Sequence, residues 1–195
     1  MSTLDNPNEL DNTNEVAAKV SPWPTGTRYG LFASLIAIVF GLVVQLTGLV
    51  DVTDQSSPTN WIVSMVNWAV MIGAIYMAVK HHRDNELGGY IDFGRGFMVG
   101  FIATLVMTAL SLIWTYIFFA FIEPDLIAEI MDVTRERMIE EQGLSEEVAD
   151  QQMSMTKFIF NPFGMAMTAG LGTMVGGLII SLIIAPILKN TPAGA

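Results

Sequence analysis

The chain has 195 residues, of which 52% are hydrophobic and only 14% are charged, and its formal net charge at pH 7 is −10. Because soluble domains carry about 25% charged residues, this composition favours a protein that lies in a lipid bilayer. The negative charge argues against nucleic-acid binding, and the absence of cysteine excludes disulfides, thiolate metal sites and cysteine nucleophiles.

Residues 1–26 are rich in Asn, Asp, Ser, Thr and Pro and contain few large apolar side chains. Such a segment cannot bury enough surface to offset the entropy of ordering, so we expect a disordered cytoplasmic tail. It carries several acids and lacks a short basic start, so we expect no cleavable signal peptide.

Four stretches contain no Asp, Glu, Lys or Arg: residues 29–50, 61–79, 97–122 and 163–188. A helix of about 20 residues crosses a hydrocarbon core of about 30 Å, so each stretch predicts a transmembrane helix. The sequence therefore predicts an all-α polytopic membrane protein. Its four-helix membrane domain would span residues 27–189 and be followed by a short cytoplasmic tail at 190–195.

The loop between the second and third stretches contains four glycines in the nine residues 88–96. That many glycines disfavour a helix, so the sequence predicts an interfacial turn. Its aromatic side chains should enter the headgroup region. The residues predicted to form this turn are Gly88, Gly89, Tyr90, Phe93 and Gly94.

Residues 123–162 carry ten acids and three bases. Apolar residues at helical spacing predict one amphipathic helix that ends near Gly143, and Ser145 predicts the N-cap of a second helix. We expect an acidic helical hairpin outside the membrane, which is a candidate surface for a protein partner. Weak binding of a divalent cation is a less favoured alternative, because a run of charges is usually a solvated face.

Lys and Arg residues near the ends of the stretches predict the orientation, because positive residues are kept on the cytoplasmic side. One side of the membrane would carry six of them and the other three. We therefore expect both termini in the cytoplasm. The six residues are Lys19, Arg28, Lys80, Arg83, Arg95 and Lys189, and the three are Arg135, Arg137 and Lys157.

Gln45 and Asn67 are the strongest polar groups inside the predicted spans, and each lies a few residues from the outer end of its span. In an antiparallel pair of helices they would lie at the same depth, which predicts an interhelical hydrogen bond. We interpret this bond as helix packing, with contact to a substrate or water as the alternative.

Small residues recur every four positions in the last span, beside a GxxxG motif, and such a row lets another backbone approach closely. The predicted helix-packing residues are Ala169, Gly172, Thr173, Gly176, Gly177, Ser181 and Ala185. Packing within the chain is the favoured interpretation, and a homo-oligomer interface or a lined pathway are the alternatives.

The only histidines are His81 and His82, beside Lys80 and Arg83. Adjacent residues of a helix point about 100° apart, so the two rings cannot easily share a metal ion. We interpret them as part of a basic belt near anionic lipid, with a metal or proton-relay role as the alternative. No catalytic motif is present, and we expect no metal and no cofactor.

The run Gly88-Gly-Tyr-Ile-Asp-Phe-Gly94, the element Glu123-Pro-Asp125 and the Ser181–Ala185 segment resemble bacterial four-span membrane proteins grouped as domain of unknown function 4199. The resemblance covers residues 27–189 and implies a bacterial inner-membrane setting and one whole-chain domain. That family has no assigned activity, so the resemblance assigns no catalytic residue.

The leading functional hypothesis is a non-enzymatic membrane protein that associates with itself through the last span or with a partner through the acidic insert. The alternative is a small transporter or channel in which oligomerised spans line a path. The predicted spans contain no charged residue, which disfavours an ion or proton pathway. An enzyme is the least favoured class, because no acid, base and nucleophile can be placed at one depth.

Overall fold

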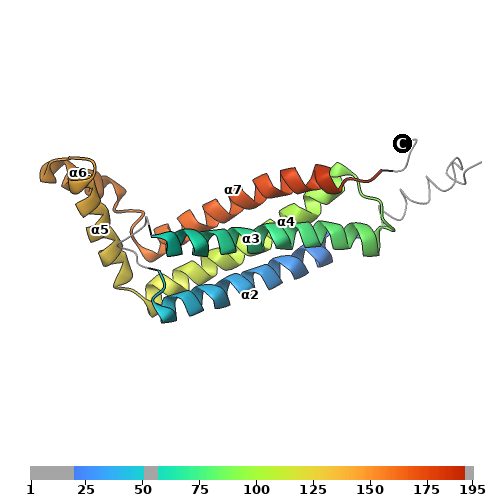
Figure 1. The fold of residues 1–195 in the computed structure, drawn as a ribbon, viewed down its shortest axis with the longest axis horizontal. Helices are drawn as coiled ribbons and strands as arrows, with labels where there is room; N and C mark the ends of the chain where they lie inside the picture. The colour runs from blue at the N-terminus through green and yellow to red at the C-terminus, as the bar shows by residue number, and fades with distance from the viewer. Residues whose placement is uncertain (1–19, 51–56, 192–195) are drawn as a thin grey trace, which may run out of the picture. The chain divides into compact units, whose positions relative to one another are not determined.

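The computed structural model describes residues 20–50 and 57–191, and the elements in these ranges are helices. In chain order they are α2 (Trp23–Thr47), α3 (Pro58–His81), η2 (His82–Glu86), α4 (Phe93–Ile117), η3 (Phe118–Ile122), α5 (Leu126–Glu140), α6 (Glu146–Thr156) and α7 (Pro162–Leu188) (Figure 1). The segments η2 and η3 are π-helical turns that continue α3 and α4. The prediction of an all-α chain is confirmed for the described residues.

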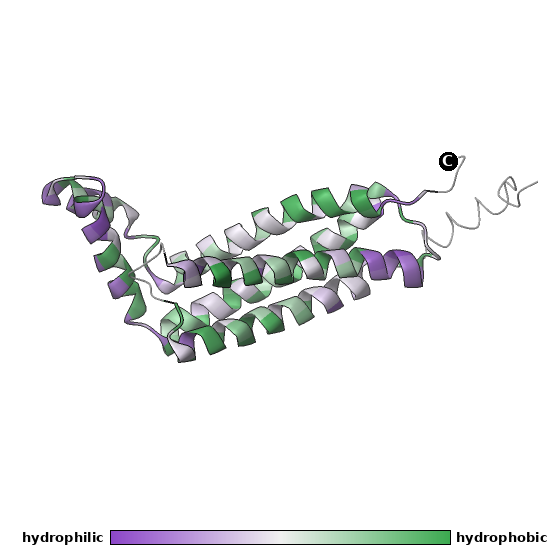
Figure 2. Cartoon of the chain, in the orientation of Figure 1, coloured by the Kyte–Doolittle hydropathy of each residue, from purple (hydrophilic) through white to green (hydrophobic). Residues whose placement is uncertain are grey.

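Four of these helices are long and apolar enough to cross a membrane: α2, α3 with η2, α4 with η3, and α7. Four such helices are typical of a multi-pass membrane protein, which the composition predicted. Figure 2 shows hydrophobic residues along these four helices, whereas hydrophilic residues gather on α5, on α6 and at the C-terminal end of α3.

Helix bounds differ from the predicted spans mainly at the end that carries the basic residues. Trp23 begins α2, so residues 23–26 are helical and not part of a disordered tail, whereas residues 1–19 lie outside the described ranges. The helix that begins at Pro58 continues as far as Glu86. The long helices therefore extend past the predicted spans and include His82, Glu86 and Arg95, whereas the predicted spans themselves contain no charged residue.

The predicted turn is confirmed at Gly88 and Gly89, which have φ angles of 66° and 96°. It is wrong at Phe93 and Gly94, which form the first turn of α4. Asp92 explains the difference, because its carboxylate accepts a hydrogen bond from the Arg95 amide at 2.9 Å and caps the helix. Tyr90 lies between the turn and the helix and is partly buried.

The chain divides into two compact units, and the division crosses all four long helices. Unit 1 comprises Met1–Ala37, Trp68–Met107 and Thr173–Ala195, and unit 2 comprises Ile38–Asn67 and Thr108–Gly172.

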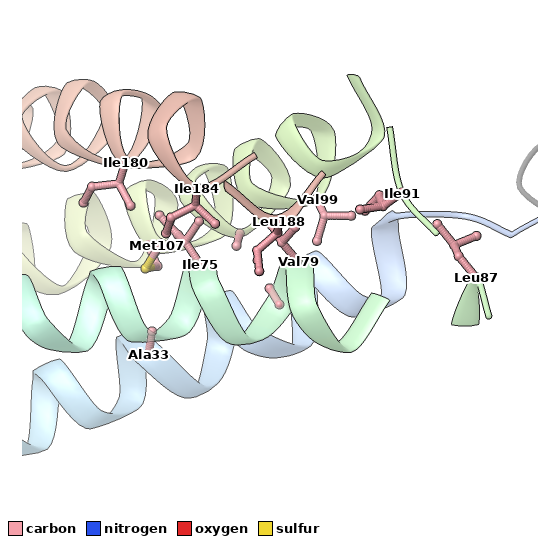
Figure 3. Packing of buried hydrophobic residues seen from close by; sticks show 12 residues of the cluster. Ala33, Ile75, Val79, Leu87, Ile91, Val99, Met107, Ile180, Ile184 and Leu188 are labelled. Atoms are coloured by element: carbon pink, nitrogen blue, oxygen red, sulfur yellow. The ribbon is translucent and has the colours of Figure 1, made fainter. Parts of the chain in front are cut away.

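A buried hydrophobic cluster fills unit 1. Figure 3 shows its side chains converging from α2, α3, α4 and α7, with Ile75 and Val79 of α3 among the most buried. Leu87 and Ile91, in the connection before α4, extend the cluster past the end of α3. Side chains that pack this closely fix the four helix segments of unit 1 against one another.

Two glycines bring α2 close to α4 in unit 1. A Cβ atom added to Gly30 would lie 2.7 Å from the Ala103 carbonyl oxygen, and one added to Gly26 would lie 2.7 Å from Ile102. Only glycine allows backbones to approach this closely. Gly26 was not predicted as a packing residue, because the composition of residues 1–26 predicts a tail.

In unit 2, Asn161 caps the start of α7, since its side-chain oxygen accepts a hydrogen bond from the Gly164 amide at 3.0 Å. Further along the same helix, Gly170 makes room for Leu112 of α4. Glycine therefore allows close packing between α4 and α7 in this unit as well.

Candidate functional site

A cluster of polar side chains lies at one end of unit 1, where α3 passes into η2. His82 is fully buried, with 0% of its surface exposed, and Thr25 of α2 is buried beside it. Glu86 of η2 and Arg95 of α4 complete the cluster, which we call the His82 cluster. Single π-helical turns such as η2 occur frequently at functional sites.

Hydrogen bonds fix the arrangement of these side chains. The Arg95 Nε–H donates to His82 Nε2 at 3.3 Å, so this ring nitrogen is an acceptor. The ring proton is therefore on Nδ1 and is donated to Glu86 Oε2 at 2.6 Å. The Thr25 hydroxyl donates to the other carboxylate oxygen of Glu86. A neutral imidazole thus lies between a carboxylate and a guanidinium.

Further hydrogen bonds hold the end of α7 at the same end of unit 1. Arg83 Nη1 donates to the Leu188 carbonyl at 3.2 Å. Ile91 and Asn190 form an antiparallel bridge, with N···O distances of 2.8 and 3.0 Å. The Asn190 side chain also donates to the Gly89 carbonyl at 2.8 Å. These bonds join segments far apart in the sequence at the end of unit 1 that holds the His82 cluster.

The His82 cluster contains an acid and a base, which the sequence analysis did not expect to meet at one depth. Its geometry does not favour catalysis on a substrate, because the imidazole is fully buried and Thr25 donates to Glu86 rather than to His82. Arg95 Nη2 is buried and has no hydrogen-bond partner within residues 20–50 and 57–191. No group of three His, Asp or Glu side chains suited to a metal ion occurs in that part of the chain. Holding or passing a proton is the chemistry that such a cluster can perform.

The predicted basic belt describes His81 better than His82. His81 is 32% exposed, and its ring lies 5.8 Å from the Tyr29 ring. His82 points into the protein, so its assignment to an exposed belt is wrong. The spacing of four residues between His82 and Glu86 was the available signal, but the sequence alone did not extend the helix this far.

The row of small residues on α7 packs against a matching row on α4. Gly177 lies against Thr104, Ser181 against Gly100, and Ala185 against Gly96. Figure 1 shows these helices side by side. The Thr104 and Ser181 hydroxyls donate to the carbonyls of Gly100 and Gly177 in their own helices, so the buried contact leaves neither hydroxyl without an acceptor.

The other predicted packing residues of α7 have different surroundings. Gly176 faces Trp68 and Met71 of α3, whereas Gly172 has open space around it. Ala169 and Thr173 are partly buried. The Gly172–Gly176 motif is therefore not one continuous contact surface, because its two glycines face different surroundings.

The predicted hydrogen bond between Gln45 and Asn67 is not formed. Both side chains are exposed, and the Asn67 amide donates to the Val63 carbonyl of its own helix at 3.1 Å. The prediction failed because equal depth along two helices does not place two residues on facing sides.

Helices α5 and α6 lie against one another in unit 2 (Figure 1). Arg135 of α5 donates from Nε to Asp150 of α6 at 2.6 Å, and its Nη2 lies 3.9 Å from Glu146. The Ser145 hydroxyl accepts from the Val148 amide, so the predicted N-cap is confirmed. Nine of the ten acids in residues 123–162 are exposed, and only Glu123 is partly buried.

The contact between Arg135 and Asp150 changes the titration of both groups. A hydrogen bond from the guanidinium stabilises the Asp150 carboxylate and lowers its pKa. The same bond raises the pKa of Arg135. Both groups are open to solvent, so salt should weaken the interaction.

Comparison with known proteins gives one match. A family model described as "Protein of unknown function (DUF4199)" matches residues 28–190, nearly the range over which the sequence resembles that family. No curated protein and no solved structure matched. Because the family model covers most of the chain, the protein belongs to the DUF4199 family.

Proposed function

We propose that this chain is a non-enzymatic protein of a bacterial inner membrane that binds a basic protein partner through residues 123–162. One observation carries the proposal: nine exposed acids lie on a segment whose two helices are joined by the hydrogen bond from Arg135 to Asp150. A fixed acidic surface attracts a basic surface and orients it during encounter. In the proposed topology this segment is an acidic hairpin outside the membrane and both termini are cytoplasmic.

Packing within the chain disfavours self-association through the small residues of α7. Gly177, Ser181 and Ala185 already contact α4, so a second copy of the chain could not use them without separating the two helices. Among the described residues of unit 2, by contrast, nothing covers the nine exposed acids of the acidic segment. Binding to a partner is therefore favoured over assembly through α7.

A photo-crosslinker placed at the exposed Gln142, between α5 and α6, tests this proposal in native membranes. We expect one discrete product, and changing Glu140, Glu141, Glu146 and Glu147 to Gln should abolish it. A crosslinker at Val43, an exposed residue of α2 that should face lipid, serves as the control. No product, or a product that survives the four changes, would refute the proposal, and a product of twice the 21.3 kDa chain mass would indicate self-association.

A second candidate function is proton-linked transport, which the buried His82 cluster favours. Ionisable residues in the helices of a membrane protein are costly and frequently belong to proton pathways. Proteoliposomes that enclose a pH-sensitive dye test it: the wild type should dissipate a proton gradient faster than His82→Ala. Asp84→Asn, outside the cluster, should retain the wild-type rate. A wild-type rate equal to that of protein-free liposomes would exclude this function.

A further inference from the structure

A shallow, open pocket of about 580 Å³ lies along one face of α2 near its N-terminal end, and we call it the groove on α2. It is lined mainly by exposed apolar side chains, with one cation among them. The residues that matter for its chemistry are Trp23, Thr27, Arg28, Leu31, Phe32 and Leu35. All of them belong to unit 1.

The order of these residues along α2 matches the order of chemical groups in one leaflet of a bilayer. Trp23 is the type of residue that lies at the headgroup level, and Arg28 follows it. Leu31, Phe32 and Leu35 come next. At 1.5 Å per residue the groove extends about 18 Å, close to half of a hydrocarbon core of about 30 Å.

Arg28 lacks a carboxylate partner among the described residues. Its guanidinium lies 5.9 Å from the centre of the Phe32 ring, and its side chain is exposed. The described acids near the start of α4 have other partners: Glu86 bonds within the His82 cluster, Asp84 pairs with Arg83, and Asp92 caps α4. No described acid pairs with Arg28, so its exposed guanidinium is available to a bound anion.

We propose that the groove on α2 binds one anionic phospholipid. Its phosphate contacts Arg28, and one acyl chain lies along Leu31, Phe32 and Leu35. Arg suits this role because its planar guanidinium donates two hydrogen bonds to a phosphate. A negatively charged headgroup is favoured over a zwitterionic one because it supplies the missing charge. This site is independent of the proposed partner surface.

Native mass spectrometry of the full chain in detergent tests the proposal, with dioleoyl phosphatidylglycerol and dioleoyl phosphatidylcholine as probes. We expect one saturable phosphatidylglycerol site with about fivefold higher affinity than for phosphatidylcholine, the ratio that one basic residue near a membrane provides. Arg28→Gln should abolish this preference.

Lys80 offers a matched control, because it is also an exposed cation over an aromatic ring, 5.9 Å from the centre of Tyr76. Lys80→Gln should retain the preference for phosphatidylglycerol. If both variants lost the preference for phosphatidylglycerol equally, the preference would come from diffuse charge attraction, and the proposed site would be refuted. Equal affinity for the two lipids in the wild type would also overturn it.

The acyl part of the site needs its own measurement. The double change Phe32→Ala and Leu35→Ala should weaken both lipids while leaving the preference intact, and a melting curve should confirm that this variant is folded. Inorganic phosphate at millimolar concentration should not displace the lipid. Displacement by phosphate, or unchanged lipid affinity in the double variant, would refute binding in the groove.

Discussion

Gly177 and Gly172 of α7 differ in what surrounds them, although both lie in the same helix. A Cβ atom at Gly177 would lie 2.5 Å from the Thr104 hydroxyl oxygen, whereas one at Gly172 meets nothing within 4 Å. We predict that Gly177→Leu destabilises the protein by about 1–3 kcal/mol, the usual cost of overpacking. Thermal unfolding in detergent measures the effect.

Gly172→Leu is the control for that substitution. It makes the same chemical change in the same helix, so helix propensity and apolar area change alike in both variants. We expect its melting temperature to equal or exceed that of the wild type. Equal destabilisation of the two variants would contradict the contact between α4 and α7.

Glu86 accepts hydrogen bonds from both His82 and Thr25, so its removal should leave two buried donors without an acceptor. We predict that Glu86→Ala lowers the free energy of unfolding by about 1–3 kcal/mol for each buried donor left without an acceptor. Denaturant unfolding followed by tryptophan fluorescence checks this value.

Asp84 provides the comparison, because it lies in the same π-helical turn but pairs with Arg83 near the surface. Asp84→Ala should leave the unfolding curve nearly unchanged, since exposed pairs contribute little. If the two alanine variants unfolded alike, the His82 cluster would not stabilise unit 1.

Among single residues, the sequence was a good guide to turns and caps and a poor guide to buried polar contacts. Gly88, Gly89 and Ser145 behave as predicted because turns and N-caps depend on a few neighbouring residues. The contact between His82 and Arg95 was missed because it depends on how the next helix enters the bundle.

Helices α5 and α6 should respond to acid through Asp150. Its pKa is lowered by Arg135, so the pair stabilises the folded segment fully above the ordinary carboxyl pKa of about 3.9. This stabilisation is lost as the pH falls through the lowered pKa of Asp150. We predict that hydrogen-exchange protection of α6, corrected for intrinsic rates, decreases over that range.

Asp150→Asn should reduce the protection of α6 already at pH 7 and respond less to acid than the wild type. Glu147→Gln changes an acid of α6 that forms no ion pair within the described residues. The hydrogen-exchange protection of α6 in this variant should match that of the wild type. Wild-type protection in Asp150→Asn would contradict a role for this ion pair.

The length of the four apolar stretches predicted the four long helices. Local contacts determine where these helices begin and end. Asp92 begins α4 earlier than the glycine content suggested. The helix from Pro58 continues to Glu86, where His82 bonds with Glu86 inside the bundle. Burial and capping can therefore override the weak helix propensity of glycine and polar residues.

The predicted orientation of the whole chain can be measured directly because the sequence contains no cysteine. A single cysteine at Gln142 should react with a membrane-impermeant maleimide in intact cells. A single cysteine at Ser21 should react only after the membrane is permeabilised. The reverse pattern would place the acidic segment in the cytoplasm and refute the proposed topology.

The sequence by itself established a membrane protein with four long apolar helices and a strongly acidic segment between the last two. These features depend on composition along the chain, because the bilayer requires about 20 apolar residues for each crossing. The structure was needed to pair Gly177 with Thr104 and to place His82 beside Arg95. Such contacts join residues far apart in the sequence, and hydrophobicity inside a membrane does not select which helix faces meet.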